Sequence, residues 1–464
     1  MIGADILNTR EGLGPMKEFK LAFPEIDQSY SLIDLQKTVK GNVKQITGNI
    51  VTVLLNPKYC KAKKIYEGQI FYDKFTNEVK FQGRIIGERE IKENQIRLWD
   101  DSLNNRLGLE IEKYFGLNYN ANKMWDAVRF VANQYEISPP KQYLERLTWN
   151  GDRGVIRKLL PTYLGAEDTE LNAWIMEHMI LGLIKRIFEP GTKFDEMMVL
   201  VGGQGIGKST FARYLAIKDD WFCTIENIHG KDAVMNLMGK TVVEIEEFVA
   251  LRNAKSANEA KSFLSKLSDR IRIPYEKFST DVPRTCILIG TLNERTFLND
   301  HTGERRYLPV ECHKENRKKA IYIDKDFQGD QSEKEYLDLI REDFNQALAY
   351  GYKLYKEKKH SWTIPKGLLE DLYQEQEKFK YLNPDVEDIR YFLEEYKPKT
   401  QEPNLTCFKE LSMQGYQIKS KSFSEIMDNY FPEWKAVRSP KTKRISPSGA
   451  SIPVKLYYER KEKV

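Results

Sequence analysis

The residues best suited to carry out chemistry form a glycine-rich stretch near the middle of the chain. It reads Gly202-Gly203-Gln204-Gly205-Ile206-Gly207-Lys208-Ser209, with Thr210 next, and so has the spacing Gly-x-x-x-x-Gly-Lys-Ser. Glycines let such a loop curl until backbone N–H groups point at phosphate oxygens beside a helix N-terminus. The lysine would neutralise β- and γ-phosphate charge, and the serine hydroxyl would join a Mg²⁺ shell. The stretch predicts a loop that binds ATP and Mg²⁺.

Such a loop carries this meaning only between a strand and a helix, and the sequence predicts both. Met197–Val201 is a short apolar run that is typical of a buried strand. Thr210–Ala216 continues as a helix, with Phe211 and Leu215 four residues apart on one face.

Hydrolysis requires carboxylates in addition to the loop. The apolar run Thr241–Ile245 ends in an acidic group made of Glu244, Glu246 and Glu247. Taken alone, such a group is usually a solvated strand end, but its place after the loop resembles the acidic strand of an ATPase. We assign Glu246 to the metal through water and Glu247 to the attacking water, with Glu244 as the competing candidate.

Two further polar groups follow the next predicted strand, Cys286–Thr291. The amide of Asn293 can hydrogen-bond a γ-phosphate or the attacking water, although an isolated asparagine is more often a turn former. Arg305 and Arg306 come after a glycine turn, and arginine stabilises a transferring phosphate from a neighbouring subunit. A pair of exposed surface arginines is the equally weighted alternative.

Short apolar strands that alternate with helical stretches predict an α/β core, with ligands outside the carboxyl ends of the strands. We divide the chain into an unassigned segment 1–45, a mainly helical region 46–188, an ATPase core 189–313, a helical cap 314–396, a linker 397–404 and a small basic α+β module 405–464.

Composition bounds the class of protein. The net charge is +5, and the five cysteines are scattered without a Cys-x-x-Cys pair, which disfavours a zinc site and fits a reducing cytoplasm. No apolar stretch approaches the length of a membrane span, and the N-terminus does not resemble an export signal. We expect a cytoplasmic protein of a bacterial host without a membrane partner.

The stretch from Tyr143 to Val310 resembles the virulence-associated protein E family of phages and genomic islands. The matching pieces are Tyr143–Gly151, Tyr163–Asp168, Pro190–Asp195, the glycine-rich loop, Gly239–Phe248, Arg272–Arg284 and Thr291–Val310. That family belongs with the superfamily 3 and poxvirus-type replicative helicases, which have an AAA+-like ATPase core.

The resemblance implies a homo-hexameric ring with ATP sites between subunits, so that Arg305 or Arg306 would reach a neighbour's γ-phosphate. It also implies a DNA-tracking hairpin at Ile271–Thr280, with Arg272 at its base and Lys277 at its tip. Many relatives carry a primase domain, but no zinc-binding cysteines or obvious carboxylate constellation precedes the loop here. We therefore do not expect primase activity in this chain. A replication initiator or a primase is a candidate partner.

The last sixty residues lie outside the resemblance. A predicted helix, Phe423–Phe431, is followed by a predicted basic loop that includes Lys441, Lys443 and Arg444, and by a terminal strand Ile452–Tyr458. This order suits a winged-helix-like DNA-binding module. A solvated basic tail on a helical cap remains the alternative.

Three functions compete. The leading one is a helicase that couples ATP hydrolysis to movement on single-stranded or forked DNA during replication of a mobile element. The second is an ATPase that acts as a switch, an assembly factor or a phage-interference factor. The third is a DNA-binding scaffold that holds nucleotide without turnover, which the acidic group and Asn293 disfavour.

Overall fold

The structure is a computed structural model of the full chain. It describes residue 21 and residues 35–55, 66–85, 96–226, 228, 230–246, 254–272, 278–293, 298, 304–322, 331–379, 384–400, 402–431, 433–445 and 452–460. The chain divides into two compact units, Met1–Phe379 and Lys380–Val464. No helix in these ranges is long and apolar enough to cross a membrane.

The first part of the larger unit combines helices with a small sheet. Its elements are α1 (Thr47–Leu55), β1 (Tyr66–Asp73), β2 (Glu78–Ile85), β3 (Ile96–Leu98), α2 (Asp101–Phe115), α3 (Ala121–Ala132) and β4 (Glu136–Ile137), with sheet order β3-β2-β1-β4. Strands β1 and β2 pair antiparallel on either side of the Asp73–Asn77 segment, from Tyr66 opposite Ile85 to Asp73 opposite Glu78. Region 46–188 therefore contains a four-stranded sheet as well as its helices.

The centre of the larger unit is a five-stranded parallel sheet. Its strands are β5 (Met197–Val201), β6 (Phe222–Ile225), β7 (Val242–Glu246), β10 (Ile287–Leu292) and β11 (Tyr307–Glu311), in the order β11-β5-β10-β7-β6. The three strands predicted from apolar runs are confirmed within one residue at each end. The fold is thus α/β with a parallel sheet.

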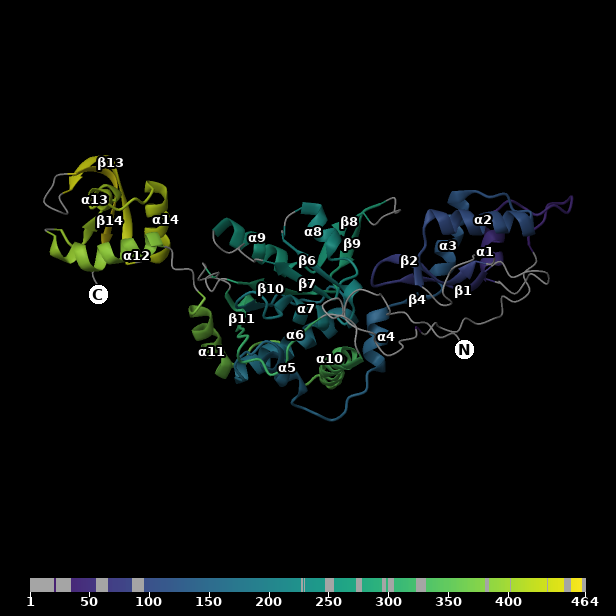
Figure 1. Cartoon of the computed structure of the whole chain (residues 1–464). Coiled ribbons are helices and arrows are strands. Elements are labelled where there is room, and N and C mark those ends of the chain that lie inside the picture. Colours follow the sequence, from purple (N-terminus) through teal and green to yellow (C-terminus); the bar gives the residue numbers. More distant parts are fainter. Residues whose placement is uncertain are drawn as a thin grey trace. The chain divides into compact units, whose positions relative to one another are not determined.

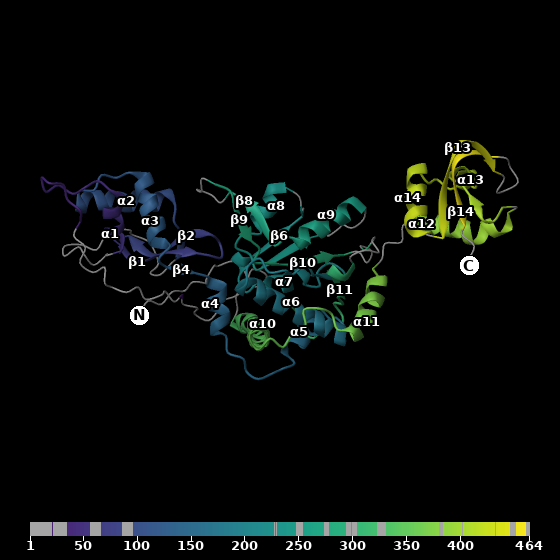
Figure 2. The same cartoon turned by 180° about the vertical axis from the view of Figure 1, so that it is seen from behind.

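Helices cover both faces of this sheet, as Figures 1 and 2 show. They are α4 (Pro139–Arg146), α5 (Val155–Tyr163), α6 (Glu170–Phe188), α7 (Lys208–Leu215), α8 (Gly230–Asn236), α9 (Ala254–Ser265), α10 (Gln331–Glu357) and α11 (Lys366–Glu377). In both views α8 and α9 lie on one side of the sheet, and α5, α6 and α10 lie on the other. A two-stranded ribbon, β8 (Ser268–Ile271) with β9 (Thr280–Pro283), precedes β10.

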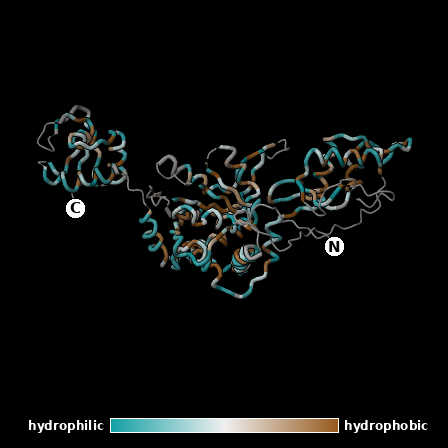
Figure 3. Tube along the Cα trace, viewed as in Figure 1, coloured by the Kyte–Doolittle hydropathy of each residue, from teal (hydrophilic) through white to brown (hydrophobic). Residues whose placement is uncertain are grey.

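The burial of the central strands explains why they read as continuous apolar runs. In β5, Met198 and Leu200 join the core on the α6 side, whereas Met197, Val199 and Val201 join a second core with residues of α9. Figure 3 shows the resulting hydrophobic colouring through the middle of this unit. A parallel strand covered on both faces needs apolar residues at every position.

The smaller unit has a different layout. It contains α12 (Pro384–Tyr391), a π-helical turn (Phe392–Tyr396), a 3₁₀ turn (Lys397–Lys399), β12 (Leu405–Thr406), α13 (Phe408–Met413), α14 (Ser420–Tyr430), β13 (Trp434–Ile445) and β14 (Ile452–Arg460). The sheet order is β12-β14-β13, and both pairings are antiparallel.

Two predictions for this end of the chain are wrong. The boundary between units follows Phe379 rather than lying at 397–404. The Lys397 side chain is fully buried, and its Nζ donates to Glu410 Oε1 at 3.0 Å and to Oε2 at 3.1 Å, so the expected linker contributes to a core. The residues expected to form a basic loop after α14 instead belong to strand β13. Because β13 lies at the edge of the sheet, its backbone pairs with β14 while its exposed cations remain in water.

Candidate nucleotide site

The glycine-rich loop joins β5 to α7, which begins at Lys208 as the spacing predicts. The Gly207 backbone has φ +103°, a left-handed conformation that side chains disfavour. At Gly202 the constraint is a close approach, because a Cβ atom there would lie 2.5 Å from the Cys312 carbonyl oxygen. The loop therefore needs glycine at these two positions.

The Lys208 ammonium group lies inside this loop and is 7% exposed. Its Nζ donates to the carbonyl oxygens of Gly202 at 2.6 Å and Gly203 at 2.8 Å, and to Asn293 Oδ1 at 3.1 Å. These three acceptors match the three hydrogens of an ammonium group. Burial lowers the pKa of Lys208. The two predicted residues Lys208 and Asn293 are thus in direct contact.

The carboxylate that meets the loop serine is Glu244. Its Oε1 accepts hydrogen bonds from Ser209 Oγ at 2.6 Å and from Thr291 Oγ1 at 2.8 Å, and its Oε2 accepts one from Thr224 Oγ1 at 3.1 Å. The side chain is 1% exposed. Of the candidate acids for the metal, the competing candidate Glu244 is therefore the one in contact with the loop serine.

Two of these contacts were missed by sequence reasoning. Thr224 lies directly opposite Glu244 in the pairing of β6 with β7, and Thr291 lies opposite Glu246 in the pairing of β10 with β7. The only sign of these contacts in the sequence is a threonine inside an otherwise apolar strand. A buried carboxylate needs such hydroxyl donors, because leaving it without hydrogen bonds is costly.

The structure describes only one of the other two acids, Glu246 and Glu247. Glu246 is exposed at the end of β7, two residues after Glu244 and therefore on the same face of the strand. Glu247 lies outside the described residues. Glu246 remains a candidate for contact with water at the carboxyl edge of the sheet.

The site offers oxygen ligands that suit Mg²⁺. Within the described ranges, no group of three or more His, Cys, Asp and Glu side chains is placed to hold a metal ion. That is compatible with Mg²⁺, which usually keeps several waters and binds through one or two protein oxygens together with substrate phosphates. Ser209 Oγ and the Glu244 carboxylate are two protein groups beside the loop that could take this role.

The arginine pair lies at the opposite edge of the sheet. Both residues directly precede β11, in which Tyr307 pairs with Met197 at the start of β5, whereas the glycine-rich loop follows Val201 at its end. Arg305 is exposed, and Arg306 Nε lies 3.1 Å from Asp195 Oδ2. Five strand residues at roughly 3.3 Å each separate the arginines from the loop of the same chain.

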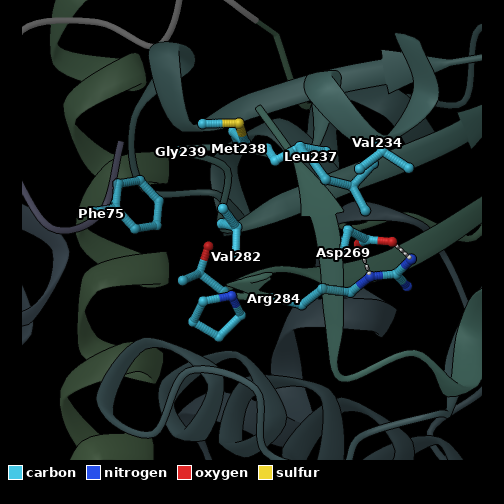
Figure 4. A pocket seen from close by; sticks show the side chains of 11 residues that line it. Phe75, Val234, Leu237, Met238, Gly239, Asp269, Val282 and Arg284 are labelled. Carbon is cyan, nitrogen blue, oxygen red and sulfur yellow. Dashed lines mark hydrogen bonds and ion pairs between the residues drawn. The ribbon is translucent and has the colours of Figure 1, made fainter. Parts of the chain in front are cut away.

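The predicted DNA hairpin, Ile271–Thr280, starts at the last residue of β8 and ends at the first residue of β9, and residues 273–277 of it lie outside the described residues. Arg272 follows β8, and Lys277 lies outside the described residues. Arg284, just beyond β9, anchors the ribbon: its Nε donates to Asp269 Oδ2 at 2.7 Å and its Nη1 to the Phe263 carbonyl oxygen at 2.5 Å. Figure 4 shows this ion pair beside a cavity of about 20 Å³, which has room for about one water molecule.

The predicted DNA-binding residues of the smaller unit fall on β13. Arg444 is exposed. Lys441 and Lys443 lie in the same strand, and the structure describes only their backbone. Lys435 and Arg438 of this strand are also exposed. In contrast, α12 and the turn after it carry the acids Asp385, Glu387, Asp388, Glu394 and Glu395. Exposed positive charge therefore lies along β13.

The fold and the site define an α/β protein in which a glycine-rich loop, a buried carboxylate and a strand-end asparagine meet at the carboxyl edge of a parallel sheet. The chain belongs to the family of the virulence-associated protein E-like domain. The family model matches residues 144–381, just over half of the chain. No match was found among curated proteins.

Distant similarity to solved structures was also found. Three of them are apo structures of the NrS-1 C-terminal region. For the first, of residues 305–718, the TM-score is 0.48 at 16% identity, and the match covers 90% of this chain and 100% of that chain. The other two, both A forms, have TM-scores of 0.46 and 0.45 at 14% and 15% identity, covering 90% and 89% of this chain and 100% and 98% of theirs.

Proposed function

We propose that this chain is an ATP-dependent DNA helicase or translocase of a phage or mobile element. It would hydrolyse ATP between subunits of a homo-hexameric ring and move on single-stranded DNA during replication. The observation that supports this most is the meeting of Lys208 with Asn293, and of Ser209 with Glu244, at one edge of the sheet.

In this proposal each residue has a distinct task. The N–H groups of the loop bind the β-phosphate, and Lys208 exchanges its carbonyl partners for phosphate oxygens when ATP arrives. Mg²⁺ would offset the negative charge of the phosphate oxygens. Ser209 and Glu244 hold it from the protein side, and Asn293 orients the γ-phosphate or the attacking water.

The water-activating base is Glu246 or Glu247. Glu244 does not fit this task, because its two oxygens already accept hydrogen bonds from the hydroxyl groups of Ser209, Thr224 and Thr291. A base must meet the nucleophile directly or through one water. The exposed end of β7 is the part of the acidic strand that meets this requirement.

The position of the arginine pair supports hydrolysis between subunits. Arg305 lies at the opposite edge of the sheet from its own loop and is exposed, so we assign it to the γ-phosphate of a neighbouring subunit. An arginine supplied from a neighbour is worth about 10³–10⁵ in rate in related chemistry. Arg306, which pairs with Asp195, would hold the turn that presents Arg305.

DNA would be bound by cations that contact its phosphates. In the larger unit these are Arg272 and Lys277 of the hairpin, whose base is held by the buried pair of Arg284 and Asp269. In the smaller unit they are Lys441, Lys443 and Arg444 of β13. Contacts of this kind are independent of sequence and weaken as salt increases.

The test is strand displacement from a forked duplex by the full chain with ATP and Mg²⁺. We expect displacement that requires ATP, and Lys277→Ala should lose it while keeping basal ATP hydrolysis. Lys113→Ala, an exposed lysine of α2 far along the chain from the site, is the matched control and should displace normally. ATP hydrolysis without displacement or DNA stimulation would instead favour a switch, assembly or interference factor.

A further inference from the structure

The segment 312–322, which directly follows β11, packs along the glycine-rich loop. It begins at Cys312, whose N–H donates to the Val201 carbonyl oxygen at 2.8 Å. The Cys312 carbonyl oxygen is the atom that leaves no room for a Cβ at Gly202. This segment therefore meets the loop at its first residue.

The same segment also holds the far end of the loop. Arg317 Nη1 donates a hydrogen bond to the Ile206 carbonyl oxygen at 3.0 Å. Next to it, Ile321 is 4% exposed and packs against Gly207, where an added Cβ would lie 2.3 Å from Ile321 Cγ2. Two side chains of one segment thus fix the peptide group between Ile206 and Gly207.

This peptide group matters because a trans peptide is planar. Its C=O and N–H bonds point in opposite directions, so a carbonyl turned toward Arg317 directs the Gly207 N–H away from Arg317. In a loop of this kind the N–H groups on that other side are the ones that bind phosphate. Without Arg317, this peptide could rotate and present its carbonyl oxygen to the anion.

The segment is itself firmly held, which lets it serve as a support. His313 N–H donates to the Leu164 carbonyl oxygen, and Lys318 N–H and Lys319 N–H both donate to the Thr162 carbonyl oxygen, each at 2.9 Å. Lys319 Nζ also lies 2.8 Å from Asp343 Oδ2 on α10. The end of α5 and the middle of α10 therefore fix the backbone from which Arg317 extends.

We propose that Arg317 is a positioning residue for nucleotide binding, which sets the Ile206–Gly207 peptide so that its N–H faces the phosphate. The inference rests on the proposed function, because it assumes that the loop binds a nucleoside di- or triphosphate. Arg317 acts through the loop and does not itself contact the nucleotide.

The test is titration of the full chain with ADP and Mg²⁺ by calorimetry, together with steady-state ATP hydrolysis. Loss of a hydrogen bond from a charged donor typically weakens an interaction about tenfold or more. We therefore expect Arg317→Ala to raise the Kd for ADP and the KM for ATP about tenfold, with kcat changed by less than about threefold. Arg317→Lys, which keeps a cationic donor, should recover part of this loss.

Lys318→Ala is the matched control. It removes the same charge from the adjacent, exposed residue, while the contact of residue 318 with Thr162 is made by the backbone and persists. It should bind ADP like the wild type. If thermal unfolding shows that Arg317→Ala does not fold, the same ADP titration and ATP hydrolysis measurements are made with Arg317→Lys and Arg317→Gln.

Two results would overturn the proposal. One is an ADP affinity unchanged by every Arg317 substitution, and the other is an equal loss in Lys318→Ala, which would indicate a general charge effect. Failure of the assumption that the loop binds nucleotide gives a different result, because the wild-type chain would then not bind ADP at all. Failure of the helicase function alone would appear as absent strand displacement while the wild-type chain still binds ADP.

Discussion

Glu244 Oε1 accepts a hydrogen bond from Ser209 Oγ at 2.6 Å, so the first of the three clustered acids, not the second, meets the loop serine. The contact joins β7 to the first turn of α7. It places a buried carboxylate next to the hydroxyl that would bind Mg²⁺ under the proposed function.

The metal dependence of ATP hydrolysis should therefore follow Glu244. Substitution of groups that orient metal ligands typically costs 10–100-fold in metal affinity. We expect Glu244→Gln to raise the Mg²⁺ concentration for half-maximal activity by roughly that factor. Glu246→Gln should leave this midpoint within about twofold and lower kcat instead, if Glu246 serves the attacking water. A Mg²⁺ titration of activity that shows the reverse pattern would return the metal role to Glu246.

Asn293 should matter for turnover more than for binding. Its Oδ1 accepts from Lys208, and the proposal places its amide near the γ-phosphate only when ATP is bound. Asn293→Ala should lower kcat by about 10²-fold, the typical effect of removing one oriented donor from a transition state. Its Kd for ADP should stay within about threefold of the wild type. Calorimetry alongside the hydrolysis assay checks both values, and unchanged turnover would remove Asn293 from the site.

A mixing experiment separates the roles of the two arginines. Arg305→Ala and Lys208→Ala should each be inactive alone, because each would disable one side of every interface in the proposed ring. Mixed subunits should recover part of the ATP hydrolysis, since some interfaces then combine an intact loop with an intact Arg305. Arg306→Ala should instead lower the melting temperature, because it leaves the nearly buried Asp195 without its ion pair. No recovery on mixing would argue against a site between subunits.

The smaller unit supplies a stability prediction. Lys397 and Glu410 are both fully buried, and Thr406 Oγ1 donates to Glu410 Oε2 at 3.0 Å. Burial lowers the pKa of Lys397 and raises that of Glu410, and the attraction between the two charges opposes both shifts.

Breaking this pair should be more harmful than removing it. Glu410→Met alone should destabilise the smaller unit by about 3–5 kcal/mol, because it leaves a buried charge unpaired. Adding Lys397→Met should restore much of this loss. Hydrogen exchange of 405–431 in the full chain measures both effects. A double variant less stable than the single one would show that the pair itself stabilises this unit.

Much of the central sheet could be predicted from sequence because its determinants are local. Strands buried on both faces appear as apolar runs, and the glycine spacing marks the turn into α7. The meeting of Lys208 and Asn293 followed from the rule that parallel strands end at one edge.

The remaining features depend on register and tertiary contacts. Which acid meets Ser209 is set by how β7 lies against α7, and adjacent glutamates give no local signal of this. The sequence around Lys397 is typical of a polar linker. Its burial cannot be predicted locally, because it depends on Glu410, thirteen residues later. The contact of Arg317 with Ile206 joins residues 111 positions apart, and no spacing rule predicts it. The basic strand β13 lacks an apolar alternation, since its exposed edge position favours cations instead.

The most direct test of the account is the rate of ATP hydrolysis by the assembled full chain, measured with and without single-stranded DNA at low and high salt. The account predicts Mg²⁺-dependent turnover that is abolished by Lys208→Ala, is stimulated by single-stranded DNA, and loses that stimulation as salt weakens the phosphate contacts. Turnover that is equal with and without DNA at every salt concentration, or no turnover at all, would contradict it.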